Sequence, residues 1–413
     1  MSATLKRAAA LRIFLCFAFG YLLSYALRSI NAVIAPALLT ELQLSNADLG
    51  LLSSAYFVAF GCMQLPLGIW LDRYGPRRTE SALLLVAALG ALVFASSTTL
   101  TGLWIGRALI GIGVSACLMA ALKGYRQWFP MEQQGRLASW MLMAGTSGAL
   151  SASVPVTMLL PHLGWRGIFY GMALLLLLTA AGLFFLLRDA EHGADVAAPV
   201  PGAPAAGGYH TIFRTPYFWR IAALGFVNHA MFAALQTLWA GPWLMTVLGA
   251  SEDQASGMLF AMNLILMLAY LALGWAAPRL VSAGWNIERL ITIGTAGMTL
   301  AQAAMVVSGG AWAWLLLLAL ALCVPVTSLV QSGSGLAFPA ALAGRANAAY
   351  NLTLFLGAFT WQWGFGVLVD AIKAAGVAPA MAFRITMAAM VLTQLCALGF
   401  FLFHRAQPDK HAQ

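Results

Sequence analysis

The stretch that decides the fold is a short charged segment between two long apolar runs: Gly68-Ile-Trp-Leu-Asp72-Arg73-Tyr-Gly75-Pro-Arg77-Arg78. Gly68 permits close approach of a neighbouring helix, and Gly75 permits a tight turn. Asp72 is placed to pair with a nearby arginine or to accept hydrogen bonds from a helix N-terminus. The segment therefore predicts a tight polar turn, with gating or structural roles for its glycines and charges, between two membrane-spanning helices.

The composition supports this prediction over the whole chain. Of its 413 residues, 62% are hydrophobic and 8% are charged, whereas a soluble domain carries about 25% charged residues. Apolar runs of about 20 residues follow one another with short breaks, which is typical of helices that cross a bilayer. The net charge of +9 comes from basic residues in those breaks, so it indicates membrane topology rather than nucleic-acid binding.

The order of these runs predicts an all-α membrane protein with twelve transmembrane helices in two pseudo-symmetric six-helix bundles. We expect an N-terminal bundle over 1–187, a flexible cytoplasmic linker rich in Pro, Gly and Ala over 188–218, and a C-terminal bundle over 219–413. The predicted helices are 13–38, 48–71, 79–98, 102–127, 136–159, 166–187, 219–247, 254–277, 288–308, 311–336, 345–371 and 379–403.

The distribution of basic residues predicts the orientation in the membrane. Most of the 22 Lys and Arg residues fall on one side of the predicted spans. Because cytoplasmic loops carry an excess of Lys and Arg, we expect both termini in the cytoplasm. The Ala- and Leu-rich composition favours a multi-pass protein of a bacterial inner (plasma) membrane, embedded in lipid.

Two halves of the chain resemble each other. Phe129-Pro130 followed by Gly135-Arg136 recurs 209 residues later as Phe338-Pro339 followed by Gly344-Arg345. Duplicated helical units commonly form the two rocking halves of a transporter. Three further matches are 206 residues apart: Pro36 with Pro242, Gly68 with Gly274, and Arg73 with Arg279.

At the segment 68–78 the sequence resembles the major facilitator superfamily, whose signature loop reads Gly-x-x-x-Asp-Arg-x-Gly-x-Arg-Arg. The fourth predicted helix adds Arg107-Ala-Leu-Ile-Gly111-Ile-Gly113, which is similar to the family's arginine-bearing helix. The resemblance covers nearly the whole chain and implies transport by alternating access. The second-half loop departs from the pattern, because Pro278 stands where Asp72 stands in the first half.

Within that superfamily the N-terminal half resembles the organic anion:cation symporter branch. The resemblance is carried by Arg28-Ser-Ile-Asn31 with Pro36, and by Trp128-Phe-Pro130. It implies that Arg28 binds the substrate anion. The branch usually has an acidic residue before this arginine, whereas this chain has Leu27.

Physical reasoning about Arg28 reaches the same site. A cation at the bilayer centre costs about 2.5–3.5 kcal/mol on insertion scales, so its presence suggests a function. Its planar guanidinium suits a carboxylate or phosphate. Tyr25 and Asn31 lie one turn away on the same helix face and are predicted to join the substrate site. Alternatively, Arg28 is a structural residue whose donors bind backbone carbonyls, and Tyr25 has a packing role without contacting the substrate.

Three other ionisable residues lie within predicted helices. Lys123 is a candidate second cation for the anion, with snorkelling to the membrane surface as the alternative. Arg107 is expected to have a structural or gating role. His229 is a candidate substrate contact or proton carrier, and a neutral packing residue is the alternative.

Polar amides complete the candidate site. They could orient the substrate or form ordinary interhelical hydrogen bonds. The predicted contacts are Gln236, Asn263, Gln331 and Asn351, with Asn347 and Gln362 noted beside them.

The charges predict the substrate class. Three cations lie within predicted helices, whereas every carboxylate, Glu80 included, is placed near a helix end or in a loop. Such a cavity would attract a small organic anion. Coupling stays open between uniport, exchange and proton symport. The alternatives are transport of zwitterionic amino acids or short peptides, and a non-transporting membrane sensor.

No catalytic motif, cofactor or metal site is expected, because the chain has no HExxH, no GxSxG and no Cys/His cluster. The expected partners are a small-molecule anion, a coupling proton and membrane lipid, for a chain acting as a monomer.

Overall fold

The structure is a computed structural model that describes residues 7–188, 209–327, 329–330, 338 and 340–404. All regular secondary structure in these ranges is helical, which confirms the all-α prediction. Within them, nine helices are long and apolar enough to cross a membrane. Two of the nine contain a non-helical glycine and so hold two straight segments each.

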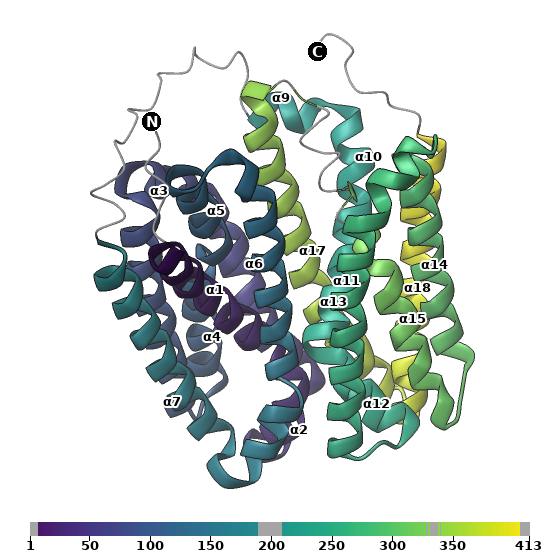
Figure 1. The fold of residues 1–413 in the computed structure, drawn as a ribbon. Helices are drawn as coiled ribbons and strands as arrows, with labels where there is room; N and C mark the ends of the chain where they lie inside the picture. The colour runs from purple at the N-terminus through teal and green to yellow at the C-terminus, as the bar shows by residue number, and fades with distance from the viewer. Residues whose placement is uncertain (1–6, 189–208, 328, 331–337, 339, 405–413) are drawn as a thin grey trace. The chain divides into compact units, whose positions relative to one another are not determined.

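The chain divides into two compact units, and the first comprises Met1–Gln43 and Ala55–Pro201. Its helices run from purple to teal in Figure 1. They are α1 (Arg7–Ser29), α2 (Asn31–Leu42), α3 (Asn46–Ser96), α4 (Leu100–Val114), α5 (Cys117–Trp128), α6 (Met131–Ser151) and α7 (Val154–Leu186).

Glycines in the left-handed region bend α3 and α7. Gly75 has φ 77° and Gly164 has φ 61°, values that side chains with a Cβ rarely adopt. The tight turn expected at Gly75 is therefore confirmed. These bends separate the spans predicted as 48–71 and 79–98, and as 136–159 and 166–187.

Small residues allow the helices of unit 1 to pack closely. A Cβ at Gly113 of α4 would collide with the backbone of Ala87 on α3, and a Cβ at Gly148 of α6 would collide with the backbone of Leu22 on α1. The close approach predicted at Gly68 is not found, because nothing in the described chain lies within 4 Å of a Cβ built there. Gly68 sits on an exposed face of α3, so its lack of a side chain leaves open space instead of admitting a neighbour.

The second unit comprises Leu44–Ser54 and Gly202–Gln413. Its first long helical run, 216–248, contains two π-helical turns, and α9 lies within the range predicted as linker (Figure 1). The helices of this unit are α9 (Tyr209–Arg214), α10 (Pro216–Leu224), η1 (Gly225–His229), α11 (Ala230–Ala234), η2 (Leu235–Trp239), α12 (Ala240–Leu248), α13 (Glu252–Ser282), α14 (Ile287–Val307), η3 (Ala311–Trp314), α15 (Leu315–Cys323), η4 (Val324–Val326), α17 (Ala340–Ala374) and α18 (Pro379–Phe403).

The segment Leu44–Ser54 belongs to unit 2 because the start of α3 packs on α17. The Asp370 carboxylate accepts hydrogen bonds from Asn46 Nδ2 and from the backbone N–H of Ala47, both at 2.7 Å. Asp370 thus satisfies a donor at a helix N-terminus, where negative charge is stabilising.

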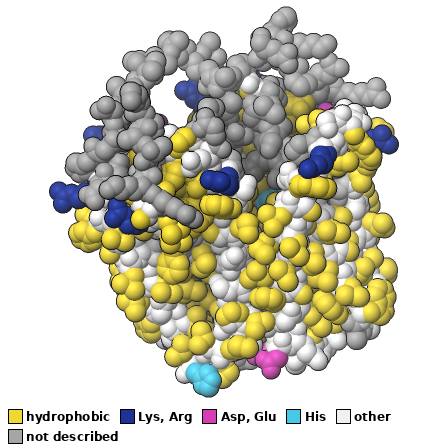
Figure 2. All heavy atoms as spheres, in the orientation of Figure 1, with side chains coloured by type: hydrophobic (Ala, Val, Ile, Leu, Met, Phe, Trp, Pro, Cys, Tyr) yellow, Lys and Arg dark blue, Asp and Glu magenta, His cyan; other side chains and the backbone are white. Residues whose placement is uncertain are grey.

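The outer faces of the helices suit a lipid environment. Large side chains such as Leu178, Phe185 and Leu300 are more than half exposed. On the face shown in Figure 2, hydrophobic side chains cover the helices and Lys and Arg side chains gather toward one end. An apolar surface of this extent would be exceptional on a protein in water.

Candidate functional site

Arg28 lies at a break in the first helix of unit 1. Helix α1 ends at Ser29 and α2 begins at Asn31. The Arg28 guanidinium carbon lies 4.7 Å from the ring centroid of Tyr25, 5.6 Å from that of Tyr56 and 5.2 Å from that of Phe60. Cation–π attraction of this kind contributes about 0.5–2 kcal/mol per ring.

A hydrogen bond further orients this guanidinium, because Arg28 Nε donates to Tyr56 Oη at 3.4 Å. Arg28 and Tyr25 are both partly exposed, whereas Tyr56 is buried. Three aromatic rings therefore surround the cation, and Tyr56 also accepts one of its hydrogen bonds. Asn31, predicted to share this site, is 2% exposed inside unit 1.

Arg107 is buried beside this break and has a different environment. Its Nη1 donates to the Leu27 carbonyl at 2.8 Å, and its guanidinium lies over the rings of Phe94 (4.9 Å) and Phe169 (5.4 Å). The side chain is 1% exposed. It ties α4 to the residue that precedes Arg28, and the structural or gating role expected for it stays a prediction.

Lys123 forms an ion pair with Asp72 of the signature segment. The Lys123 side chain is 24% exposed and that of Asp72 is 77% exposed. The prediction that Lys123 is a second substrate cation has no support from this geometry. The pair instead links α5 to α3, because lysine reaches outward from an apolar helix with its long stem.

The other basic residues of the signature segment are divided between interior and surface. Arg77 is 4% exposed, donates to the Phe184 carbonyl of α7 at 2.5 Å and stacks on the Phe184 ring. Arg73 and Arg78 are exposed, and Arg73 lies over the ring of Tyr74. Arg77 thus joins α3 and α7 of unit 1.

In unit 2, His229 ends the first π turn and contacts the η4 region. His229 Nδ1 lies 2.9 Å from Thr327 Oγ1, and that hydroxyl donates its single hydrogen to the Val324 carbonyl at 2.7 Å. The hydroxyl must therefore accept from His229, so Nδ1 carries the hydrogen. A π turn at a potential ligand contact is a recurrent feature of functional helices.

This network predicts the tautomer of His229. In selectively ¹⁵N-histidine-labelled protein at alkaline pH, we expect the His229 Nδ1 resonance to have the shift of a protonated nitrogen. The variant T327V removes the acceptor and should move the tautomer toward Nε2–H. His404, at the far end of α18, provides an internal control whose spectrum stays the same; an unchanged His229 tautomer in T327V would contradict the assigned network.

The predicted amide contacts of unit 2 are partly used within the unit. Gln236 Nε2 donates to Asn263 Oδ1 at 2.7 Å, and Asn263 Nδ2 donates to the Leu259 carbonyl at 2.9 Å. Asn351 on α17 is partly exposed. Gln331 lies outside the described residues. The Gln236–Asn263 bond shows the interhelical role that the sequence left open.

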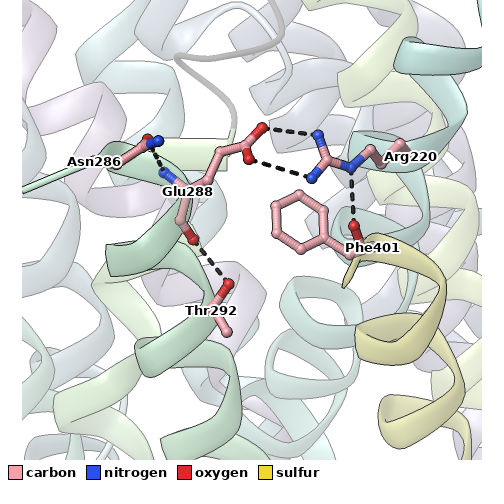
Figure 3. Close-up of polar contacts among 5 residues, drawn as sticks. All are labelled: Arg220, Asn286, Glu288, Thr292 and Phe401. Atoms are coloured by element: carbon pink, nitrogen blue, oxygen red, sulfur yellow. Dashed lines mark hydrogen bonds and ion pairs between the residues drawn. The ribbon is translucent and has the colours of Figure 1, made fainter. Parts of the chain in front are cut away.

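An ion pair that the sequence did not reveal fixes one end of unit 2 (Figure 3). Arg220 Nη1 and Nη2 lie 2.8 Å and 3.3 Å from the two Glu288 carboxylate oxygens, and Arg220 Nε donates to the Phe401 carbonyl at 2.9 Å. Asn286 caps α14 by accepting from the Glu288 N–H. The bidentate pair, a strong form of charge-assisted hydrogen bond, ties α10, α14 and α18 together.

Two features of unit 1 were not predicted from the sequence. Tyr56 and Phe60 complete the aromatic surround, and their i, i+4 spacing is the signal that could have indicated them. Glu80, placed by the sequence near a helix end, is 0% exposed.

For the residues that the structure describes, no group of three or more His, Cys, Asp or Glu side chains could hold a metal ion.

These features define the class of the protein: a helical protein that crosses the membrane many times and has a cation in the break of its first span. The family model for the Major Facilitator Superfamily matches residues 17–362, and the chain belongs to this family. The predicted twelve-helix fold is thereby confirmed.

Curated relatives and solved structures agree with this family. A probable L-galactonate transporter of Escherichia coli (strain K12) is 27% identical over 304 residues, 68% of this chain and 64% of that protein. A hexuronate transporter of the same strain is 30% identical over 183 residues, 43% and 41% of the two chains. The chain thus spans less than two thirds of the length of these relatives.

The fold is also similar to a crystal structure of a bacterial homologue of the human lysosomal transporter Spinster. The TM-score is 0.77 at 18% identity, over 98% of this chain and 100% of that chain. At this identity the likeness concerns the fold alone.

Proposed function

We propose that this protein carries a small carboxylate, of the sugar-acid class, across the membrane by alternating access, and is a transporter rather than an enzyme. The observation that carries the proposal is the position of Arg28, a guanidinium at the break between α1 and α2 with Tyr25, Tyr56 and Phe60 around it. The names of the relatives, transporters of L-galactonate and hexuronate, support the substrate class.

The aromatic surround explains how such a site would select its substrate. Rings attract the faces of the guanidinium without neutralising its charge, so the positive field stays available to an anion. The edge donors of a guanidinium match a carboxylate in a bidentate arrangement. Tyr25 and Asn31 are proposed to contact the same substrate from unit 1.

In unit 2 the proposed substrate contacts are His229, Gln236, Asn263 and Asn351. A sugar acid has several hydroxyl groups that need hydrogen-bonding partners when they leave water, and amides and imidazole both donate and accept. We also propose a coupling proton, a monomeric state, and a location in a bacterial inner membrane with both termini in the cytoplasm.

The test is transport by the purified full chain in proteoliposomes. Radiolabelled D-glucuronate should enter, whereas D-glucose and the methyl ester of glucuronate should not, because both lack the carboxylate. Empty liposomes give the background. Binding in a thermal-shift assay without any flux would favour a membrane sensor, and uptake of amino acids or dipeptides instead of sugar acids would favour the zwitterion alternative; either result contradicts the proposal.

A further inference from the structure

A buried carboxyl group lies inside unit 1 and has no part in the site described above. Glu80 follows the Gly75 bend of α3 and is 0% exposed. A carboxylate in such surroundings costs several kcal/mol unless a cation or several donors compensate for its charge. The neighbours of Glu80 therefore decide whether the group is charged or holds a proton.

The chain leaves space for this carboxyl group against the backbone of α1. A Cβ built on Gly20 would lie 2.8 Å from Glu80 Oε1, closer than real Cβ contacts come. The same point lies 3.7 Å from Thr179 Cγ2 on α7 and 3.8 Å from Leu84 Cδ1 on α3. Glu80 Oε1 thus packs directly against Gly20, where a Cβ would displace it.

The titratable groups that face Glu80 are neutral ones. They are Cys16 on α1, and Cys117 and Tyr125 on α5. The Cys117 thiol, a weak donor, lies beside the carboxyl group, but neither carboxyl oxygen has a hydrogen bond of good geometry within the described residues. Arg12, one turn earlier in α1, acts electrostatically on Cys16.

The repeat supplies a direct comparison. Arg220 and Glu288 of unit 2 are each 208 residues after Arg12 and Glu80, close to the offsets of the other matched positions. In unit 2 the carboxylate is neutralised by the bidentate Arg220 pair (Figure 3). In unit 1 the equivalent carboxyl group is buried and neither of its oxygens has a hydrogen-bond partner among the described residues, so a bound proton is the remaining way to neutralise it.

The position of Glu80 also connects it with Arg28. The Cys117 thiol lies within electrostatic reach of both Arg28 and Glu80, so both groups border one buried region of unit 1, where charges act over longer distances than in water. An anion bound at Arg28 cancels positive charge there, and proton binding at Glu80 then becomes more favourable. Release of the anion has the opposite effect.

We propose that Glu80 is the proton-binding site that couples transport to the proton gradient. The Glu80 carboxylate takes up one proton on one side of the membrane and forms the neutral acid. It releases this proton on the other side later in the transport cycle. The inference rests on the proposed function for its coupling role, whereas proton binding by Glu80 can be measured without any substrate.

The first experiment measures that proton directly. Infrared difference spectra of the full chain in liposomes, recorded over a pH titration, should show the carbonyl band of a protonated carboxylic acid that is absent from E80Q and present in E288Q. Gly20→Ala, which presses a Cβ against Oε1, should shift the pH midpoint of this band while the protein stays folded, and it serves as the second variant if E80Q does not fold. A wild-type spectrum without the band, or the same band in E80Q, would overturn the proposal.

The second experiment measures coupling with radiolabelled D-glucuronate. An inward gradient of one pH unit stores about 1.4 kcal/mol and drives about tenfold accumulation of a solute moved with one proton. In E80Q the ratio of gradient-driven accumulation to counterflow should fall by about this factor. Normal accumulation by E80Q would overturn the proposal, whereas a wild-type protein that shows the Glu80 band and moves no glucuronate would contradict the proposed substrate and leave proton binding established.

Discussion

The variant R28Q is expected to lower carboxylate uptake about a hundredfold or more while the protein still folds. Glutamine keeps polarity but removes the charge and the planar fork. Two charge-assisted hydrogen bonds contribute about 1.5–3 kcal/mol each, and each 1.4 kcal/mol is a factor of ten in affinity. Initial rates of glucuronate uptake in proteoliposomes, at matched protein density, measure the loss.

The matched control is R214Q, the same substitution at the exposed arginine that ends α9. R214Q should transport as the wild type does. R28K, which keeps the charge without the fork, should fall between wild type and R28Q. Full uptake by R28Q would remove Arg28 from the substrate site and with it the reason for expecting an anion.

Arg107 is expected to show the opposite behaviour, a loss of folded protein. R107Q leaves the Leu27 carbonyl without its 2.8 Å donor and removes a guanidinium that is 1% exposed between two rings. Leaving a buried carbonyl without its hydrogen bond costs about 1–3 kcal/mol. The variant should give a lower yield and a lower midpoint of thermal unfolding in detergent than R28Q.

Comparing the R28Q and R107Q variants separates a loss of transport from a loss of stability. They lie on neighbouring helices of unit 1 and differ in burial, because Arg28 is partly exposed and Arg107 is enclosed. If R107Q unfolds at the wild-type temperature while R28Q is unstable, the assigned roles are reversed. Addition of glucuronate should raise the unfolding temperature of wild type but not that of R28Q.

Features with a local cause could be predicted from the sequence. Apolar runs predict spans because the bilayer requires about 20 residues per helix, and Gly75 predicts its turn because few residues adopt its φ. The position of Arg28 within the first span follows from counting residues along a helix. Each of these features depends on residues that are neighbours in the chain, so it can be predicted from a single sequence.

Features that depend on distant residues could not be predicted. Lys123 and Asp72 are 51 residues apart, and nothing in either helix indicates that they pair. Glu80 lies close to Arg77 and Arg78 in sequence and was placed at a helix end, yet the bend at Gly75 carries it inward against Gly20. The hydrogen bond between Gln236 and Asn263 likewise depends on how two helices cross. The two π turns of the 216–248 run have no sequence signal at all.

The first span of each repeat is irregular at the same place. The break after Ser29 corresponds, at the offset of 206 residues, to Leu235 at the start of η2. Side chains of other helices bind backbone carbonyls in both spans: Arg107 binds that of Leu27 beside the break, and Trp361 binds that of Phe226 in the other π turn, η1. A helix supported in this way can change its bend by exchanging carbonyl partners, at little cost in hydrogen bonding. We therefore expect the first span of either repeat to bend at this irregular turn while the helical segments on each side stay rigid.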